Sequence, residues 1–353
     1  MLQEDESVQE FFSNKSKTRE FRKETWVEND IILASRLIDH WKTSTCPQLR
    51  VEDNHDAFQG DSIPRKIPKV IHFIWLGSDG IPQFPVFCDE YREDDTLSDM
   101  NEAMYSWRKH HKEWQIHVWR DADIIKLLSR YDSNHKYLSA KKLYEEAVNA
   151  QKYGMASDIA RIFVLYFIGG VYVDIDYICN NSFDLLHDTF EFYCGASNVG
   201  CVEINNGIIG SIQGHWFLEM VMDQLCGLCD VRCKSSSVTN FISDFLDHDS
   251  ILSLKGASSV LYFSDMDVID RTGPGMFTRA VLNIFASQQD CLGLDKFAVL
   301  PARFFHPMPN TESIKNGKSD FSDVISYLNS NSFAVHLWSC SWQLPPRNHK
   351  SIK

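Results

Sequence analysis

The chain has 353 residues, of which 44% are hydrophobic and 24% charged, and these are ordinary fractions for a globular protein. This length allows one large domain, or one domain with an appendage. The formal net charge is −13, from 35 basic and 48 acidic residues. This charge argues against non-specific binding to nucleic acid, and it suits a site in which a cation holds an anionic ligand.

No stretch of the sequence is apolar for long enough to span a membrane. The first six residues are acidic and lack the basic and apolar regions of a signal peptide. As written, the chain is therefore expected to be a soluble cytoplasmic protein.

Residues 1–62 are expected to form a helical appendage and linker. Apolar residues between positions 21 and 41 recur at helical spacing, and residues 51–61 are polar and acidic. The helix either braces the main domain or docks on a membrane or a partner. Its mixed charges favour the brace, so membrane association is not indicated. Residues 63–345 are expected to form the main domain, and residues 346–353 a C-terminal tail.

Residues 67–77 predict the first strand of the main domain, with Pro68 before the strand because proline cannot donate to a ladder. His72 alternates onto one face with apolar neighbours, so it is expected to be a buried structural histidine. Helices are predicted at 100–111 and 138–153, a strand at 114–118, and a further helix capped by Asp121. Alternating strands and helices indicate an α/β sheet with parallel character, whose catalytic groups collect at the strands' carboxyl ends.

The central stretch, residues 156–176, reads as a helix, a glycine break and a short buried strand ending in two acids. Asp158 and Arg161 lie three apart and share one helix face. Gly169 and Gly170 end the helix, because glycine accepts the left-handed backbone needed there. Residues 171–175 are apolar and rich in strand-forming residues, as a central strand should be.

Asp174 and Asp176 are two apart, so in a strand they present their carboxylates together. Such acids repel each other unless a cation lies between them, and hard oxygen ligands suit magnesium or manganese shared with a phosphate-bearing substrate. Three other Asp-x-Asp pairs occur in the chain, at 121/123, 247/249 and 265/267. Only the pair at 174/176 follows a buried strand and a Gly-Gly break, which favours a metal site over a solvated turn.

The central stretch resembles the sugar-binding DXD region of glycosyltransferase family 32. The matching residues are Ser157-Asp158-x-x-Arg161 and Leu165-Tyr166-x-x-Gly169-Gly170-x-Tyr172-x-Asp174-x-Asp176. The family includes yeast-type initiating α1,6-mannosyltransferases, sphingolipid mannosyltransferases and animal α1,4-galactosyltransferases, and clostridial glucosylating toxins have a similar catalytic core. Further pieces resemble the family in the same order, at residues 67–75, 203–211, 214–218, 272–275, 301–307 and 332–342.

The resemblance implies a GT-A fold, with a mixed, mainly parallel central sheet. It also implies a metal-dependent retaining glycosyltransferase that moves a hexose from a UDP- or GDP-sugar to a glycan, glycolipid or protein. The cofactor would be Mn²⁺ (or Mg²⁺), held by Asp174, Asp176 and His336, since imidazole is a good manganese ligand beside carboxylates. For His336 the alternative is a core histidine at a strand end.

The resemblance also assigns residues to the donor. Asp158 and Arg161 would clamp sugar hydroxyls and phosphate, Arg161 by bidentate contact, and Asp174 would reach the ribose or sugar. Trp75 would stack on the base or else belongs to the core. Asn206 would face the sugar or else forms a turn before Gly207. Ser341 and Trp342 would lie on a loop that closes over the donor.

Golgi members of the family carry an N-terminal anchor, so a Golgi lumenal location is expected only if such an anchor has been removed. Two other classes remain open. A haloacid-dehalogenase-type phosphohydrolase also has an Asp-x-Asp after a strand, but its motif has Thr or Val at the position that Ile178 occupies in this chain. A catalytically inactive sugar-nucleotide-binding protein would bind a donor without turnover. The cluster Cys226, Cys229 and Cys233 is expected to consist of packed thiols, since a zinc site would need a fourth ligand.

Overall fold

The computed structural model describes residues 66–77, 80–82, 101–130, 135–199, 202–225, 265–286, 296–312 and 321–339. The predicted appendage at 1–62 and the tail at 346–353 lie outside these ranges, as do the donor-loop residues Ser341 and Trp342 and the cysteines 226, 229 and 233. The domain boundaries therefore stay predictions. Within the described ranges, no helix is both long and apolar enough to cross a membrane.

The main sheet has the strand order β2-β1-β3-β6-β5-β7. Its strands are β1 (Val70–Ile74), β2 (Gln115–Trp119), β3 (Gly170–Val173), β5 (Phe192–Ala196), β6 (Ile204–Ser211) and β7 (Phe297–Leu300). β1 pairs in parallel with β2 and β3, and β5 in parallel with β7, whereas β6 runs antiparallel to β3 and β5. The predicted α/β class with a mixed, mainly parallel sheet is confirmed.

A second sheet pairs β4 (Tyr177–Cys179) antiparallel with β8 (Ala334–His336), and Tyr177 lies opposite His336. The chain leaves the main sheet after β3 and enters this small sheet at β4. The turn between the two strands carries Asp174 and Asp176. The pairing of β4 with β8 therefore brings a C-terminal segment beside the two acids.

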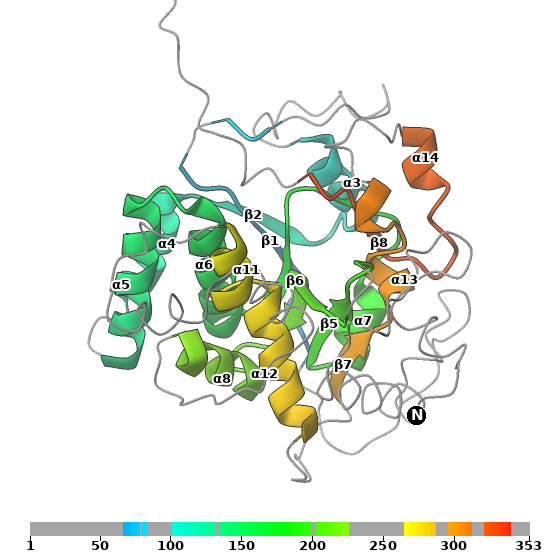
Figure 1. Ribbon diagram of the computed structural model, residues 1–353. Helices are drawn as coiled ribbons and strands as arrows, with labels where there is room; N and C mark the ends of the chain where they lie inside the picture. Colours follow the sequence, from blue (N-terminus) through cyan, green and yellow to red (C-terminus); the bar gives the residue numbers. More distant parts are fainter. Residues whose placement is uncertain are drawn as a thin grey trace, which may run out of the picture.

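Helices cover the main sheet on both sides (Figure 1). One group gathers around α6 (Tyr153–Ile168), which contacts β1, β3 and β6. It comprises α4 (Asp121–Ser129), α5 (His135–Asn149), α8 (Trp216–Leu225), α11 (Asp265–Arg271) and α12 (Pro274–Ala286). α3 (Glu102–His110) packs on β4, and α13 (Ala302–Phe305) contacts β5 and β8. The remaining elements are α7 (Asp184–Thr189), the 3-10 turn Asn310–Glu312 and α14 (Phe321–Ile325).

The glycine break between α6 and β3 is confirmed. Gly169 and Gly170 have φ angles of 76° and 104°, in the left-handed region that favours glycine. A Cβ atom on Gly170 would lie 2.6 Å from the Val70 carbonyl oxygen. His72 is fully buried, donates from Nε2 to the Gly169 carbonyl at 2.8 Å and accepts at Nδ1 from Trp119. Burial lowers the pKa of His72 to about 4, so His72 is the structural histidine that was predicted.

Two local predictions were wrong. Asp121 does not cap its helix: Arg120 is the N-cap residue, and the Asp123 carboxylate accepts the Arg120 N–H at 3.1 Å. The Asp121 side chain instead bonds to a segment distant in the sequence: its Oδ2 accepts the Gly77 N–H at 3.0 Å. The strand predicted to reach residue 175 ends at Val173, so the two acids lie in a turn rather than in the strand.

Candidate metal and donor site

Asp174 is held at the carboxyl end of β3 by contacts with the neighbouring strand β6. The Asp174 N–H donates to the Gly207 carbonyl at 2.8 Å. A Cβ atom on Gly207 would lie 2.7 Å from Asp174 Oδ2 and 2.9 Å from the Tyr177 hydroxyl. Because glycine has no Cβ atom, the Asp174 carboxylate can occupy this space.

Asp176 is buried and bonded to the C-terminal segment. Its Oδ1 lies 3.2 Å from His336 Nε2, and its Oδ2 accepts from the backbone N–H and the hydroxyl of Ser339 at 2.9 and 2.7 Å. Burial alone would raise the pKa of Asp176, but these partners outweigh burial and lower the pKa to about 2. Asp176 is therefore ionised near neutral pH.

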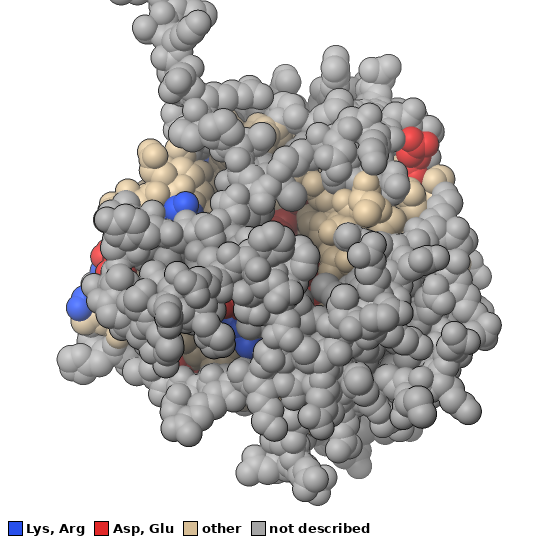
Figure 2. Space-filling model, viewed as in Figure 1, with Lys and Arg blue, Asp and Glu red and all other residues tan. Residues whose placement is uncertain are grey.

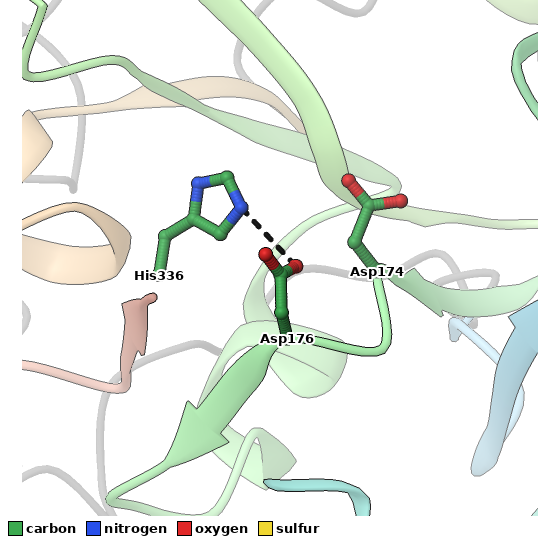
Figure 3. A group of neighbouring side chains, drawn as sticks. All are labelled: Asp174, Asp176 and His336. Carbon is green, nitrogen blue, oxygen red and sulfur yellow. Dashed lines mark ion pairs between the residues drawn. The ribbon is translucent and has the colours of Figure 1, made fainter. Parts of the chain in front are cut away.

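Aromatic rings fix the orientation of the His336 imidazole. It stacks on Tyr177, with ring centroids 4.2 Å apart and ring planes 2° apart. The Trp338 ring also lies beside it, with a distance of 4.2 Å between ring centroids. Its Nε2 points toward Asp176 (Figure 3). Its Nδ1 is buried and has no hydrogen-bond partner among the described residues.

Three side chains together offer metal ligands that fit a divalent cation: those of Asp174, Asp176 and His336. Each residue offers one ligand atom, and these atoms all lie within 4.8 Å of one another. Burial raises the pKa of Asp174, Arg161 lowers it, and the charge of Asp176 raises it again, so the two acids repel each other. A cation between them would relieve this repulsion, and two carboxylates with an imidazole suit manganese. We call these three residues the metal cluster.

Arg161 links the metal cluster to a second group of buried charges. Its Nη2 lies 3.1 Å from Asp158 Oδ1 and 3.4 Å from Asp174 Oδ1, and its Nη1 donates to the Asn206 carbonyl at 2.8 Å. The guanidinium also lies 4.5 Å from the centre of the Tyr172 ring, whose hydroxyl donates to Asp174. Arg161 is thus held between α6, β3 and β6.

Asp158 is surrounded by protein donors. Its Oδ1 accepts from the Asn206 side-chain amide at 2.9 Å, and its Oδ2 accepts from the Thr272 hydroxyl at 3.0 Å. Burial raises the pKa of Asp158 to about 6, although Arg161 and Thr272 act in the opposite direction. We call Asp158, Arg161, Asn206 and Thr272 the Asp158 cluster.

Trp75 lies directly beyond β1, which is the neighbour of β3 in the sheet. It is partly exposed, packs against the core, and donates from Nε1 to the Gly80 carbonyl at 3.0 Å. This position at the carboxyl end of a parallel strand is compatible with both interpretations of Trp75, the base-stacking ring and the core side chain. Figure 2 shows a few acidic and basic side chains near the centre of one face of the molecule.

Sequence reasoning missed four residues that support these acids: Tyr172, Gly207, Thr272 and Ser339. Tyr172 had a usable signal, because it precedes Asp174 by two positions within the strand pattern. Thr272 falls in the piece at 272–275 that resembles the family, and its partner Asp158 lies 114 residues away. No local pattern predicts a contact at that separation.

The comparisons with known proteins agree with the geometry. Residues 98–192 match the family model described as "Glycosyltransferase sugar-binding region containing DXD motif". This segment contains Asp158, Arg161, Asp174 and Asp176. Residues 98–192 are thus similar to a glycosyltransferase sugar-binding region. The predicted resemblance is therefore confirmed.

Two relatives of the DXD glycosyltransferase region come from Schizosaccharomyces pombe. Inositol phosphoceramide mannosyltransferase 1 is 30% identical over 141 residues, covering 39% of this chain and 37% of the relative. Inositol phosphoceramide mannosyltransferase 3 is 28% identical over 188 residues, covering 50% and 42%. The matches thus span less than half the length of these relatives. Among solved structures, the PaToxG glycosyltransferase is similar with a TM-score of 0.40 and 16% identity, covering 72% of this chain and 79% of that chain.

Proposed function

We propose that this chain is a metal-dependent glycosyltransferase that moves a hexose from a nucleoside-diphosphate sugar to an acceptor. The donor would carry uridine or guanosine, and the acceptor would be a glycan, a glycolipid or a protein. The observation that carries the proposal is the convergence of Asp174, Asp176 and His336 beside the buried Arg161. Arg161 and the two acids lie within the matched sugar-binding region, residues 98–192, and His336 reaches them from the second sheet.

Asp174, Asp176 and His336 would hold the cation, with Mn²⁺ or Mg²⁺ as the candidates. A bound divalent cation would neutralise negative charge on the diphosphate as it leaves. The low pKa of Asp176 keeps its carboxylate ionised and ready to bind a cation. Ser339 holds the Asp176 carboxylate in place, and the Tyr177 ring holds the His336 imidazole in place, so both ligands would be oriented before a cation binds.

The other predicted donor contacts are part of the same proposal. Arg161 supplies buried positive charge next to Asp174, where it favours an anionic diphosphate. Asp158 and Asn206 would act on the sugar beside Arg161, and Asp174 would reach the ribose or sugar. Trp75 would stack on the base from the end of β1, and Ser341 and Trp342 would close over the donor.

We further propose that the reaction retains the configuration of the sugar, as in the resembled family. The acceptor hydroxyl would attack from the side of the leaving group, so that a new bond to the anomeric carbon replaces the bond to the diphosphate, whose departing oxygen would take the hydroxyl proton. Burial of Asp158 and Asp176 within hydrogen-bonded clusters leaves neither free to form a glycosyl intermediate.

A panel of UDP- and GDP-sugars tests the proposed function through hydrolysis of the donor in the presence of Mn²⁺, Mg²⁺ or a chelator. We expect hydrolysis of one donor class, dependent on the metal and lost with the chelator. An aryl phosphate is the control substrate for a phosphohydrolase. Phosphate release from that substrate, without cleavage of any sugar nucleotide, would contradict the proposal.

A further inference from the structure

Thr272 lies in the turn between α11 and α12, and it is 2% exposed. Its hydroxyl lies 3.0 Å from Asp158 Oδ2 and 3.1 Å from the Val268 carbonyl oxygen. A hydroxyl has only one hydrogen to donate, so only one of these oxygens receives it. The choice decides whether Thr272 merely closes the end of α11 or acts on Asp158.

The backbone resolves that choice in favour of Asp158. The Val268 carbonyl already accepts the N–H groups of Thr272 and Gly273, at 3.1 and 2.9 Å. A carbonyl oxygen has two lone pairs, and both are therefore used. Hydrogen bonds to a carboxylate are also stronger than those to a neutral carbonyl. The Thr272 hydroxyl hydrogen thus goes to Asp158.

The turn that carries Thr272 has little room to move. A Cβ atom on Gly273 would lie 3.0 Å from the Ile269 Cα, so the turn packs directly on α11. One turn into α12, the Thr278 hydroxyl accepts the Ile204 N–H at 2.9 Å at the start of β6. The turn is therefore fixed to the same strand that supplies Asn206, and it can hold the Thr272 hydroxyl at a constant position.

We propose that Thr272 is a positioning residue for donor binding, which it serves by fixing the Asp158 carboxylate that orients Arg161. The connection runs from Thr272 to Asp158, then to Arg161 Nη2, and from there to Asp174. It couples the α11–α12 pair to the first acid of the metal cluster. The expected effect of Thr272 on glycosyl transfer rests on the proposed function. Its effect on the orientation of Arg161 does not, and it can be measured without turnover.

The test compares Thr272→Val with Thr272→Ser and with the control Thr189→Val. Valine keeps the shape of threonine but removes the hydroxyl, whereas serine keeps the hydroxyl. We expect Thr272→Val to lower kcat/KM for donor hydrolysis by about tenfold or more, at an unchanged metal midpoint, because a small displacement of a positioned group is costly. Thr272→Ser should recover most of this loss. Thr189→Val removes a hydroxyl that donates to the Leu185 carbonyl within α7, so it should leave kcat/KM within about twofold.

A second measurement follows the Arg161 side chain itself. The ¹⁵N–¹H resonance of Arg161 Nε, assigned by its loss in Arg161→Lys, should shift in Thr272→Val and stay in place in Thr189→Val. An unchanged resonance together with wild-type kcat/KM in folded Thr272→Val would overturn the inference. If Thr272→Val does not fold, Thr272→Ala takes its place with the same expectations. If the wild-type chain cleaves no donor, the proposed function fails, and the Arg161 resonance still decides whether Thr272 positions Arg161.

Discussion

The metal cluster and the Asp158 cluster meet at Arg161, and they differ in how completely protein groups compensate the charges of their acids. In the metal cluster, two acids face each other beside a histidine, and the side chain of Asp174 is 30% exposed. In the Asp158 cluster, the Asp158 and Arg161 side chains are 8% and 6% exposed. Every polar contact described for Asp158 in that cluster comes from a donor of this chain.

This difference separates a group that can take up a ligand from a group that holds a shape. The two acids of the metal cluster offer ligand atoms within 4.8 Å of each other, and the charge of Asp176 raises the pKa of Asp174. A cation bound between the two acids would relieve this repulsion. The Asp158 cluster balances its acid with a guanidinium and neutral donors. Changes in the first cluster should therefore affect binding and turnover more than folding. Changes in the second should affect both.

Asp176→Asn has the largest expected effect on turnover. The amide preserves the shape of the side chain but cannot supply the charge that binds a cation, and a loss of several kcal/mol of charge stabilisation, or about a hundredfold in rate or more, is expected. The measurement is donor hydrolysis at saturating Mn²⁺, with melting curves to check the fold. Asp188→Asn is the control, because Asp188 forms an exposed ion pair with Lys66. Retention of more than about a tenth of wild-type activity in Asp176→Asn would remove this acid from the metal cluster.

Arg161→Lys should lower both stability and turnover. Lysine keeps the charge but cannot reproduce the fork that reaches Asp158, Asp174 and the Asn206 carbonyl. We expect a loss of about 1.5–3 kcal/mol in the free energy of unfolding. Urea unfolding and donor hydrolysis measure the two effects. Arg279→Lys, in the separate ion pair with Asp270, is the matched control and should leave turnover intact. A variant with full activity and stability would show that the Asp158 cluster does not depend on the fork.

His336→Ala should raise the Mn²⁺ requirement more than it lowers maximal turnover. Water can replace one ligand of a cation while both acids remain, and loss of a supporting group typically costs about ten- to a hundredfold in metal affinity. The measurement is a Mn²⁺ titration of donor hydrolysis, with His72→Gln as a control for loss of a buried histidine away from the acids. An unchanged Mn²⁺ midpoint in a folded His336→Ala protein would return His336 to a purely structural role.

The sequence predicted those elements whose signal is local. The helix before Gly169, the glycine break and the strand that begins at Gly170 follow from apolar spacing and from the backbone that glycine permits. His72 was predicted as structural because strand alternation placed it on an apolar face, and the structure buries it.

The parts that failed depend on partners distant in the sequence. Asp121 was expected to cap a helix, yet its carboxylate bonds to Gly77 instead, 44 residues away. The carboxylates of Asp174 and Asp176 were expected to align along a strand. They converge in a turn, because β4 pairs with β8 and Ser339 holds Asp176 from 163 residues away. Only the assembled sheets specify these contacts.

Nucleotide binding followed with and without Mn²⁺ tests the central claim most directly. Calorimetric titrations of UDP and GDP into the wild-type chain and into Asp176→Asn need no acceptor and no knowledge of the sugar. If Asp174, Asp176 and His336 hold the cation for a diphosphate, one nucleotide should bind the wild-type chain only with Mn²⁺ present, and Asp176→Asn should bind it weakly in either condition. Equal binding with and without Mn²⁺, or equal binding by both proteins, would contradict the account.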